Sequence, residues 1–421
     1  MNVLTKKQIN VNIIIFTISK TIAALGGNVY AFGMGLYILS LTGSASNFAI
    51  GLICSVVPRI LFGSIAGVWA DRFSKKKIII SAQIIQAITL STFFIIGLSS
   101  EISLLLIYGT TIILSICSTF SSITFTSSIP SLVSEEKIQK ATSLNQSAVS
   151  FAMIGAPILG GFLYSFLTIN TFILANAITY LLSATLDGAL KFSKKISDDE
   201  SLMEENNFWS DIKSGFSYIK SNSFLFKILI PVGLLVNFFG VSLQVGLPYI
   251  VVERLELTSY QFGIIEGSMA IGMLVMSIIL STKKENKNPL NNMKVGLLAL
   301  SILFGLLTVP LIWDISSIIV FIYYVSLQLS FGLIVVFLNT PLYVLMQKII
   351  SGEYRGRVFG IVETLANVIT PVGMIIYGFL FDYLNPSWIL VTSALAILLI
   401  ALLKLKSSST NRVSTKISEV S

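Results

Sequence analysis

The sequence predicts an all-α membrane protein with twelve transmembrane helices, arranged as two six-helix halves with both termini in the cytoplasm. Its composition is 54% hydrophobic and only 11% charged, and its mean hydropathy is +0.86. Apolar runs of roughly 18 residues or more recur along it, each long enough to cross the hydrocarbon of a bilayer. Lysine and arginine gather in alternate connections between these runs, the pattern typical of cytoplasmic loops.

Helices are expected in every run, because lipid offers no hydrogen-bond partner to an unpaired backbone. The runs are also too continuous for the alternating strands of an outer-membrane barrel. Spans are expected at 12–39, 46–70, 78–98, 103–127, 145–167, 171–190, 224–252, 259–281, 293–312, 315–346, 358–381 and 386–405.

The net charge of +8 is a topology signal and does not indicate nucleic acid as a partner. Most of the 28 Lys and Arg residues fall in the N-terminus, the even-to-odd loops or the tail, so the basic surplus faces the cytoplasm and anionic membrane lipids. Cys54 and Cys117 lie inside apolar runs, which predicts small core residues and no disulfide. The first apolar run is too long for a cleavable signal peptide.

One long polar stretch, 191–223, divides the chain into a first half at 1–190 and a second half at 224–405, followed by a cytoplasmic tail at 406–421. Its first part, to residue 206, is expected to be a linker. Its second part is expected to form an amphipathic helix on the cytoplasmic membrane surface, with an apolar face made of Phe208, Trp209, Ile212, Phe216 and Ile219.

The two halves also look related. Pro130 near the end of span 4 corresponds to Pro341 near the end of span 10, and Pro157 in span 5 corresponds to Pro371 in span 11. The two pairs are separated by nearly equal lengths of chain. Parallel repeats of this kind place a substrate site where the halves meet, near the bilayer midplane.

The loop between spans 2 and 3 carries the most specific motif. It contains Gly67, Asp71, Arg72, Lys75 and Lys76 in the pattern Gly-x-x-x-Asp-Arg-x-x-Lys-Lys. This resembles the signature loop of the major facilitator superfamily of secondary transporters, and the resemblance implies a gating role. A plain cytoplasmic loop without gating is the alternative. Its counterpart in the second half, Ser281-Thr-Lys283-Lys284-Glu285, lacks the Asp-Arg pair, which predicts an asymmetric gate.

Span 5 contains Gly155, Pro157, Gly160 and Gly161 in a pattern that resembles the Gly-Pro-x-x-Gly-Gly motif of exporters that exchange a drug for protons. Ala156 stands where that motif usually has Gly. Physically, the proline removes a helix hydrogen bond and the glycines permit close helix contact. Packing alone, without any bearing on transport direction, is the alternative interpretation.

Two further loops resemble those of the macrolide-efflux-type branch of drug:proton antiporters, at 130–146 and 353–360. The resemblance implies a multidrug efflux pump of a bacterial cell membrane that exports an amphiphilic molecule by proton antiport and confers antibiotic resistance. It implies alternating access, a monomer and no cofactor. Many such antiporters carry an Arg in span 4, whereas here that span has a hydroxyl stripe, Thr111, Ser115, Ser118 and Ser122.

Ionisable groups inside spans are the best candidates for proton coupling, because each is costly unless it faces protein or water. Glu266 in span 8 and Glu363 in span 11 are the candidate proton carriers, and Lys20 and Arg59 are candidate buried partners. Structural ion pairs between these groups are the alternative. Cavity-lining candidates are Asn28, Tyr30, Asn237, Gln244 and Asn367, for which ordinary interhelical hydrogen bonding is the competing role.

Enzyme functions are disfavoured. The chain has no His, which excludes the usual catalytic triads and His-based metal sites, and no Gly-Lys dipeptide, so no phosphate-binding loop for ATP. A gradient must therefore drive transport. Export of an endogenous metabolite, siderophore or lysolipid remains open on the same scaffold, as does a non-transporting membrane sensor.

Overall fold

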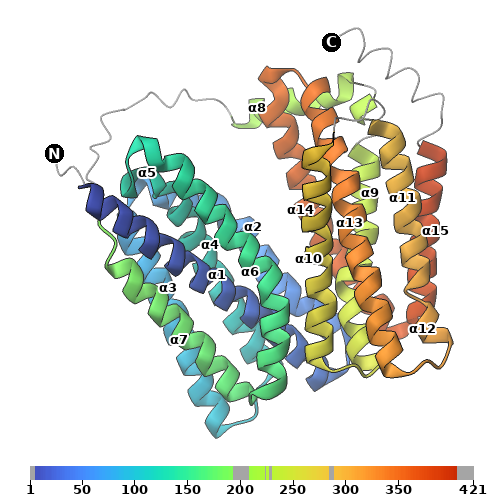
Figure 1. Cartoon of the computed structure of the whole chain (residues 1–421), viewed down its shortest axis with the longest axis horizontal. Coiled ribbons are helices and arrows are strands. Elements are labelled where there is room, and N and C mark those ends of the chain that lie inside the picture. The colour runs from blue at the N-terminus through green and yellow to red at the C-terminus, as the bar shows by residue number, and fades with distance from the viewer. Residues whose placement is uncertain (1–4, 193–207, 223, 227–229, 284–288, 405–421) are drawn as a thin grey trace. The chain divides into compact units, whose positions relative to one another are not determined.

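The computed structural model describes residues 5–192, 208–222, 224–226, 230–283 and 289–404. Nearly all of them are helical, and twelve helices are long and apolar enough to cross a membrane (Figure 1). The predicted all-α class with twelve spans is confirmed. Most of the predicted linker and the tail at 406–421 lie outside the described residues.

The first part of the chain forms α1 (Lys6–Thr42), α2 (Ala45–Arg72), α3 (Lys75–Ser99), α4 (Leu104–Ser127), the short α5 (Ile129–Leu132) and η1 (Glu135–Lys137), α6 (Ile138–Phe166) and α7 (Ile169–Gly188). The second part forms α8 (Phe208–Ser221), α9 (Ile230–Pro248) with its π-helical continuation η3 (Tyr249–Arg254), α10 (Ser259–Thr282), α11 (Pro289–Leu306), α12 (Val309–Ile312), α13 (Ser317–Ile349), α14 (Gly352–Tyr383) and α15 (Pro386–Lys404).

Hydroxyl side chains start several of these helices. Thr5, Ser44, Ser103 and Thr168 each accept a hydrogen bond from a backbone N–H of the first turn of α1, α2, α4 and α7. Such caps satisfy donors that have no partner within the helix. Gly43 ends α1 with φ 59°, a left-handed conformation in which glycine pays no Cβ penalty.

The helices reach further than the sequence prediction at several ends. The predicted loop between spans 2 and 3, at 71–77, is mostly helical, so only Phe73 and Ser74 lie outside α2 and α3. Span 5 begins at Ile138 instead of residue 145, because the helix continues through polar residues that hydropathy does not count. Pro341 lies inside α13 although Pro130 lies in a separate short helix, so the two halves differ at this point.

The chain divides into two compact units. Unit 1 contains residues 1–200 together with 258–267, and unit 2 contains residues 201–257 and 268–421. The first part of α10 belongs to unit 1, together with the N-terminal helices. Each unit is described by itself below.

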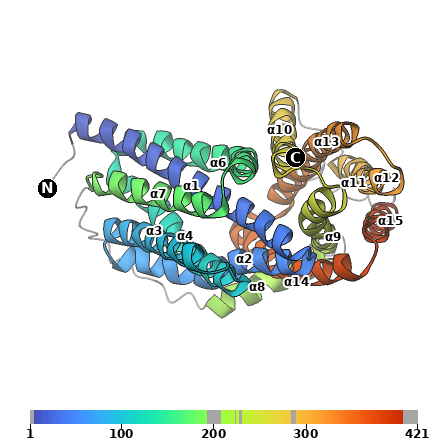
Figure 2. The ribbon, with the colours of Figure 1, turned by 90° about the horizontal axis from the view of Figure 1, so that it is seen from below.

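In unit 1, α1 lies between α6 and α7, and α3 packs on both α7 and α4 (Figure 2). Buried apolar residues fill the end of this bundle that is predicted to face the cytoplasm; they are Ile9, Ile13, Phe16, Ile79, Phe125, Ile129, Leu132, Val133, Ala141 and Leu190. Phe16 and Phe125 stack in this cluster with ring centroids 4.7 Å apart.

In unit 2, α11 packs between α13 and α15, and α14 packs on α9 and α8. The remainder of α10 lies close to α13 at two glycines. A Cβ on Gly272 would meet the carbonyl oxygen of Leu329, and a Cβ on Gly332 would meet the carbonyl oxygen of Met269. Small residues let two backbones approach in this way, which is the usual basis of helix contact inside a membrane.

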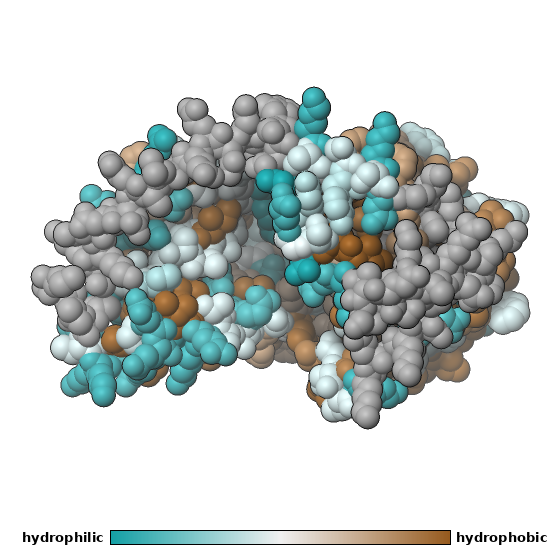
Figure 3. Space-filling view, turned by 90° about the horizontal axis from the view of Figure 1, so that it is seen from above, coloured by the Kyte–Doolittle hydropathy of each residue, from teal (hydrophilic) through white to brown (hydrophobic). Residues whose placement is uncertain are grey.

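Figure 3 shows helix ends of each unit, those near α5 in unit 1 and those near α8 in unit 2. Within each unit taken by itself, hydrophilic side chains lie at these ends, and more hydrophobic ones lie deeper among its helices. This distribution is expected where helices leave the hydrocarbon and enter water.

Candidate functional site

The antiporter-like motif of α6 brings three helices of unit 1 together. A Cβ on Gly161 would lie 3.1 Å from the Cα atom of Gly263 on α10, and a Cβ on Gly263 would meet the carbonyl oxygen of Pro157. A Cβ on Gly160 would lie 3.0 Å from the ring of Phe32 on α1. The motif therefore allows α1 and α10 to pack closely on α6.

An aromatic stack completes this contact. The rings of Phe32 on α1 and Phe262 on α10 are nearly parallel, at 9°, with centroids 5.4 Å apart. We call the meeting point of Phe32, Pro157, Gly160, Gly161, Phe262 and Gly263 the α1–α6–α10 junction.

Glu266 lies beside this junction, one helical turn beyond Phe262. Gly263 and Gly267 both pack against α6, the latter against Ile158, and Glu266 lies between them along α10. The side chain of Glu266 is half-buried. No other described residue forms a hydrogen bond or ion pair with it.

The residues of the predicted gating loop fall into two groups. Lys75 Nζ donates a hydrogen bond to the carbonyl oxygen of Ser127 at 2.8 Å, at the end of α4. Lys76 Nζ donates to the carbonyl oxygens of Gly188 at 2.7 Å and Leu190 at 2.8 Å, at the end of α7. Both lysines place positive charge where helix dipoles are negative.

Asp71 and Arg72 behave differently from the two lysines. Both side chains are exposed on the last turn of α2. A Cβ on Gly67 would find nothing within 4 Å, so this glycine is not closely packed here. The loop thus joins helix ends within unit 1 through its lysines, whereas Asp71 and Arg72 form no hydrogen bond or ion pair with any described residue.

A polar face lies on α9 and α14 in unit 2. Thr370 Oγ1 donates a hydrogen bond to Asn237 Oδ1 at 3.2 Å, which joins the two helices. Asn237 and Gln244, two turns apart on α9, are both exposed, and so are Glu363 and Asn367 on α14. Polar side chains that remain uncovered within membrane spans are expected to face water or substrate.

The two predicted charge partners differ in their surroundings. Lys20 is buried, with 8% of its surface exposed, and its ammonium donates to Ser122 Oγ at 3.2 Å and lies 5.3 Å from the ring centre of Phe125. Arg59, in contrast, is exposed on α2, next to Pro58, so the expectation of a buried arginine does not hold. Glu363 on α14 is likewise exposed.

The other candidates of unit 1 also divide between open and covered positions. Asn28 on α1 is exposed, whereas Tyr30 is 3% exposed and lies inside the bundle. The hydroxyl stripe of α4 is not one open face: Ser118 and Ser122 are exposed, but Ser115 is buried and donates to the carbonyl oxygen of Ser55 on α2 at 2.6 Å.

A family model of the Major Facilitator Superfamily matches residues 16–370, which run from within α1 to within α14. The chain belongs to the Major Facilitator Superfamily. It is therefore a multi-pass cell-membrane transporter of small molecules and not an enzyme.

Two curated relatives within the superfamily are named macrolide efflux protein A. That of Streptococcus pyogenes is 26% identical over 364 residues, which cover 86% of this chain and 87% of the relative. That of Enterococcus faecalis is 27% identical over 334 residues, which cover 79% of this chain and all of the relative. The resemblance to the macrolide-efflux-type branch is confirmed at this level.

A solved superfamily structure supports the fold. The crystal structure of a bacterial homologue of the human lysosomal transporter Spinster, inward-facing and occupied, matches with a TM-score of 0.65, 12% identity and coverage of 98% of each chain. At this identity the match concerns the fold alone.

Sequence reasoning overlooked one charged residue of this Major Facilitator chain. Asp187 lies inside the predicted span 171–190, in the last turn of α7, and is only 1% exposed. The sequence did contain a signal for Asp187, because it is an acidic residue within an otherwise apolar span. Its place near the end of that span, however, is also where ordinary polar residues at a membrane boundary occur.

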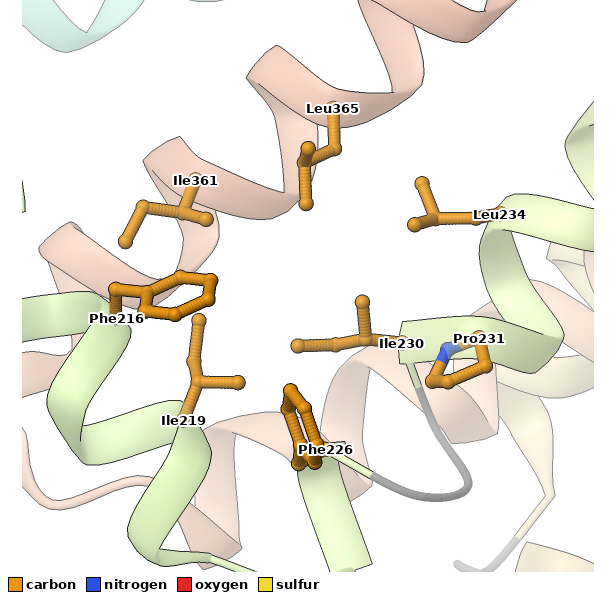
Figure 4. A pocket seen from close by; sticks show the side chains of 8 residues that line it. All are labelled: Phe216, Ile219, Phe226, Ile230, Pro231, Leu234, Ile361 and Leu365. Carbon is orange, nitrogen blue, oxygen red and sulfur yellow. The ribbon is translucent and has the colours of Figure 1, made fainter.

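Unit 2 also contains an apolar pocket of about 500 Å³ between α8, α9 and α14. Its lining residues point toward a common space (Figure 4); they are Phe216, Ile219, Phe226, Ile230, Pro231, Leu234, Ile361 and Leu365. Phe216 and Ile219 belong to the predicted apolar face of the amphipathic helix. None of the eight lining residues is titratable, so the pocket offers only apolar contact.

Proposed function

We propose that this transporter exports an amphiphilic small molecule in exchange for protons, by alternating access, and that Glu266 is the coupling carboxylate. The observation that carries the proposal is the position of Glu266. It lies half-buried beside the α1–α6–α10 junction, and no described residue supplies a counter-charge.

A carboxylate in such a place is costly while it is charged, and a bound proton removes that charge. The same junction contains the glycines and proline of the antiporter-like motif, so a change at Glu266 acts directly on the packing of three helices. Glu363 is the weaker candidate, because its exposed side chain has no comparable contact with helix packing.

The proposed substrate class rests on two supports. The first is that two relatives are named for the efflux of macrolides, which are amphiphilic molecules. The second is the surface of α10 around Glu266, which combines glycines with Met269 and Met273; the flexible side chains of methionine adapt to differently shaped apolar groups.

The test is proton flux in inverted membrane vesicles that have been acidified inside. Macrolides and amphiphilic cations are added, and the wild type is compared with Glu266→Gln and Glu363→Gln. We expect substrate-dependent proton release from the wild type and Glu363→Gln, and none from Glu266→Gln.

Correct insertion of each variant is checked by size-exclusion chromatography of the purified protein. Release that survives in Glu266→Gln would remove this residue from the coupling role. A wild type that responds to no compound of the panel would contradict drug export and would favour lipids or endogenous metabolites as substrates.

A further inference from the structure

Asp187 is a buried carboxylate that the proposed function does not use. Gln83 Nε2 on α3 donates a hydrogen bond to Asp187 Oδ2 at 2.7 Å. The other oxygen, Oδ1, is buried and accepts no hydrogen bond within 3.5 Å among the described residues, although the Ser19 hydroxyl on α1 lies near the carboxylate. An ionised carboxylate normally accepts several hydrogen bonds, so this one is incompletely satisfied.

Two lysines act on Asp187 by their charge, Lys20 from α1 and Lys76 from α3. Neither forms an ion pair with it within the described part of the chain. Lys76 donates to the carbonyl oxygens of Gly188 and Leu190, and Lys20 donates to Ser122 Oγ. The carboxylate therefore has positive charge nearby but no direct counter-ion, an arrangement that is costly to keep buried.

The surroundings limit access to Asp187 from one direction. The apolar cluster of unit 1, which includes Phe16, Phe125 and Leu190, fills the bundle end next to it. On another side, Lys20 links the interior to Ser122, whose side chain is exposed on α4. Ser122 is thus the exposed group that the described contacts connect to this part of the interior.

The cluster also connects helices. Ser19 is adjacent to Lys20 in the chain, and Ser183 lies one turn before Asp187. The Ser19 hydroxyl donates to the carbonyl oxygen of Ser183 at 3.4 Å, and the Ser183 hydroxyl donates to the carbonyl oxygen of Ser19 at 3.2 Å, so the two serines join α1 to α7. Gln83 joins α3 to α7, and Lys20 joins α1 to α4. A change of charge at Asp187 therefore acts where four helices of unit 1 meet.

We propose that Asp187 is a second proton-binding site of this transporter, with Gln83 as its positioning residue and Lys20 as the neighbouring charge. Proton binding forms an O–H bond at Oδ1 with a proton from the aqueous phase, and the carboxylate loses its charge. A role of Asp187 in transport rests on the proposed exchange of substrate for protons. The binding of a proton by Asp187 does not depend on that proposal.

A direct test is infrared spectroscopy of the purified protein during a pH titration, which detects the C=O stretch of protonated carboxyl groups. We expect a titrating band in the wild type and in Glu266→Gln that disappears in Asp187→Asn. Identical titrating bands in the wild type and Asp187→Asn would overturn the proposal. This readout requires no substrate.

Gln83→Leu keeps the carboxylate and removes its hydrogen-bond donor. Gln86→Leu is the matched control, because Gln86 is equally buried on α3 and donates to the carbonyl oxygen of Leu114 at 3.2 Å, away from Asp187. We expect the infrared titration to shift in Gln83→Leu and to remain in place in Gln86→Leu. Equal shifts in both would indicate a general packing effect and would also overturn the proposal.

The two proposals fail separately. A wild type that shows the Asp187 band but no substrate-dependent proton release contradicts the proposed antiport and leaves the proton site. A wild type that releases protons, with an unchanged infrared titration in Asp187→Asn, contradicts only the second site.

Discussion

At the scale of single residues, the contact between α6 and α10 depends on the absence of side-chain atoms. The backbones of Gly161 on α6 and Gly263 on α10 lie so close together that a Cβ atom on either residue would collide with the backbone of the other helix. Pro157 contributes its carbonyl oxygen to the same contact. A motif that resembles a functional signature in sequence is therefore also a steric requirement in the structure.

We predict that Gly161→Ala destabilises the protein and Gly155→Ala does not. A Cβ at residue 161 would lie 3.1 Å from a Cα atom, and backbone cannot move aside as a side chain can. Overpacking of this kind typically costs about 1–3 kcal/mol. A Cβ at residue 155 would lie 3.6 Å from Leu25 Cδ2, an ordinary contact.

The measurement is thermal unfolding of the two purified variants in detergent, followed by tryptophan fluorescence. Equal melting temperatures for Gly161→Ala and Gly155→Ala would show that the α6–α10 contact relaxes without cost.

At the scale of elements, the α2–α3 connection secures two other helices of unit 1. Lys75 and Lys76 lie at the start of α3 and donate to carbonyl oxygens at the ends of α4 and α7. Each helix end has carbonyl groups without partners inside the helix, and a lysine satisfies them while it opposes the negative dipole. The basic residues that mark the loop in the sequence thus also have a structural function.

We predict that Lys76→Met destabilises unit 1, because two carbonyl oxygens near the end of α7 lose their donor; the expected loss is about 1–2 kcal/mol. Lys77→Met is the matched control, since the Lys77 side chain is exposed and donates no hydrogen bond to any described residue.

Hydrogen exchange of peptides from the last turns of α7 would check this prediction. Faster exchange in Lys76→Met than in Lys77→Met is the expected result. Similar exchange in both variants would mean that Lys76 contributes only its positive charge to the loop and does not stabilise the end of α7.

At the scale of the whole molecule, the distribution of basic residues predicts which helix connections face the cytoplasm. The α2–α3 connection is strongly basic, whereas the α3–α4 connection carries Glu101 and no basic residue. Since short basic loops stay in the cytoplasm, these two connections should lie on opposite sides of the membrane.

We predict that a membrane-impermeant maleimide labels Ser100→Cys in intact cells but labels Ser74→Cys only after permeabilisation. Both positions are exposed at helix connections, and both variants are made after replacement of Cys54 and Cys117 by alanine. Labelling of Ser74→Cys in intact cells would reverse the assigned topology.

The sequence by itself determined the twelve spans, the class of fold and the family, because hydropathy and loop charge are local quantities that lipid and water act on directly. It also singled out the α6 motif and Glu266 as candidates. The tertiary structure decided which polar groups are covered. It buried Lys20 and Asp187 and left Arg59 and Glu363 exposed, because the surroundings of a side chain depend on neighbouring helices that are distant in sequence. For the same reason, only the structure could show that Gln83 meets Asp187 and that Lys76 serves the end of α7.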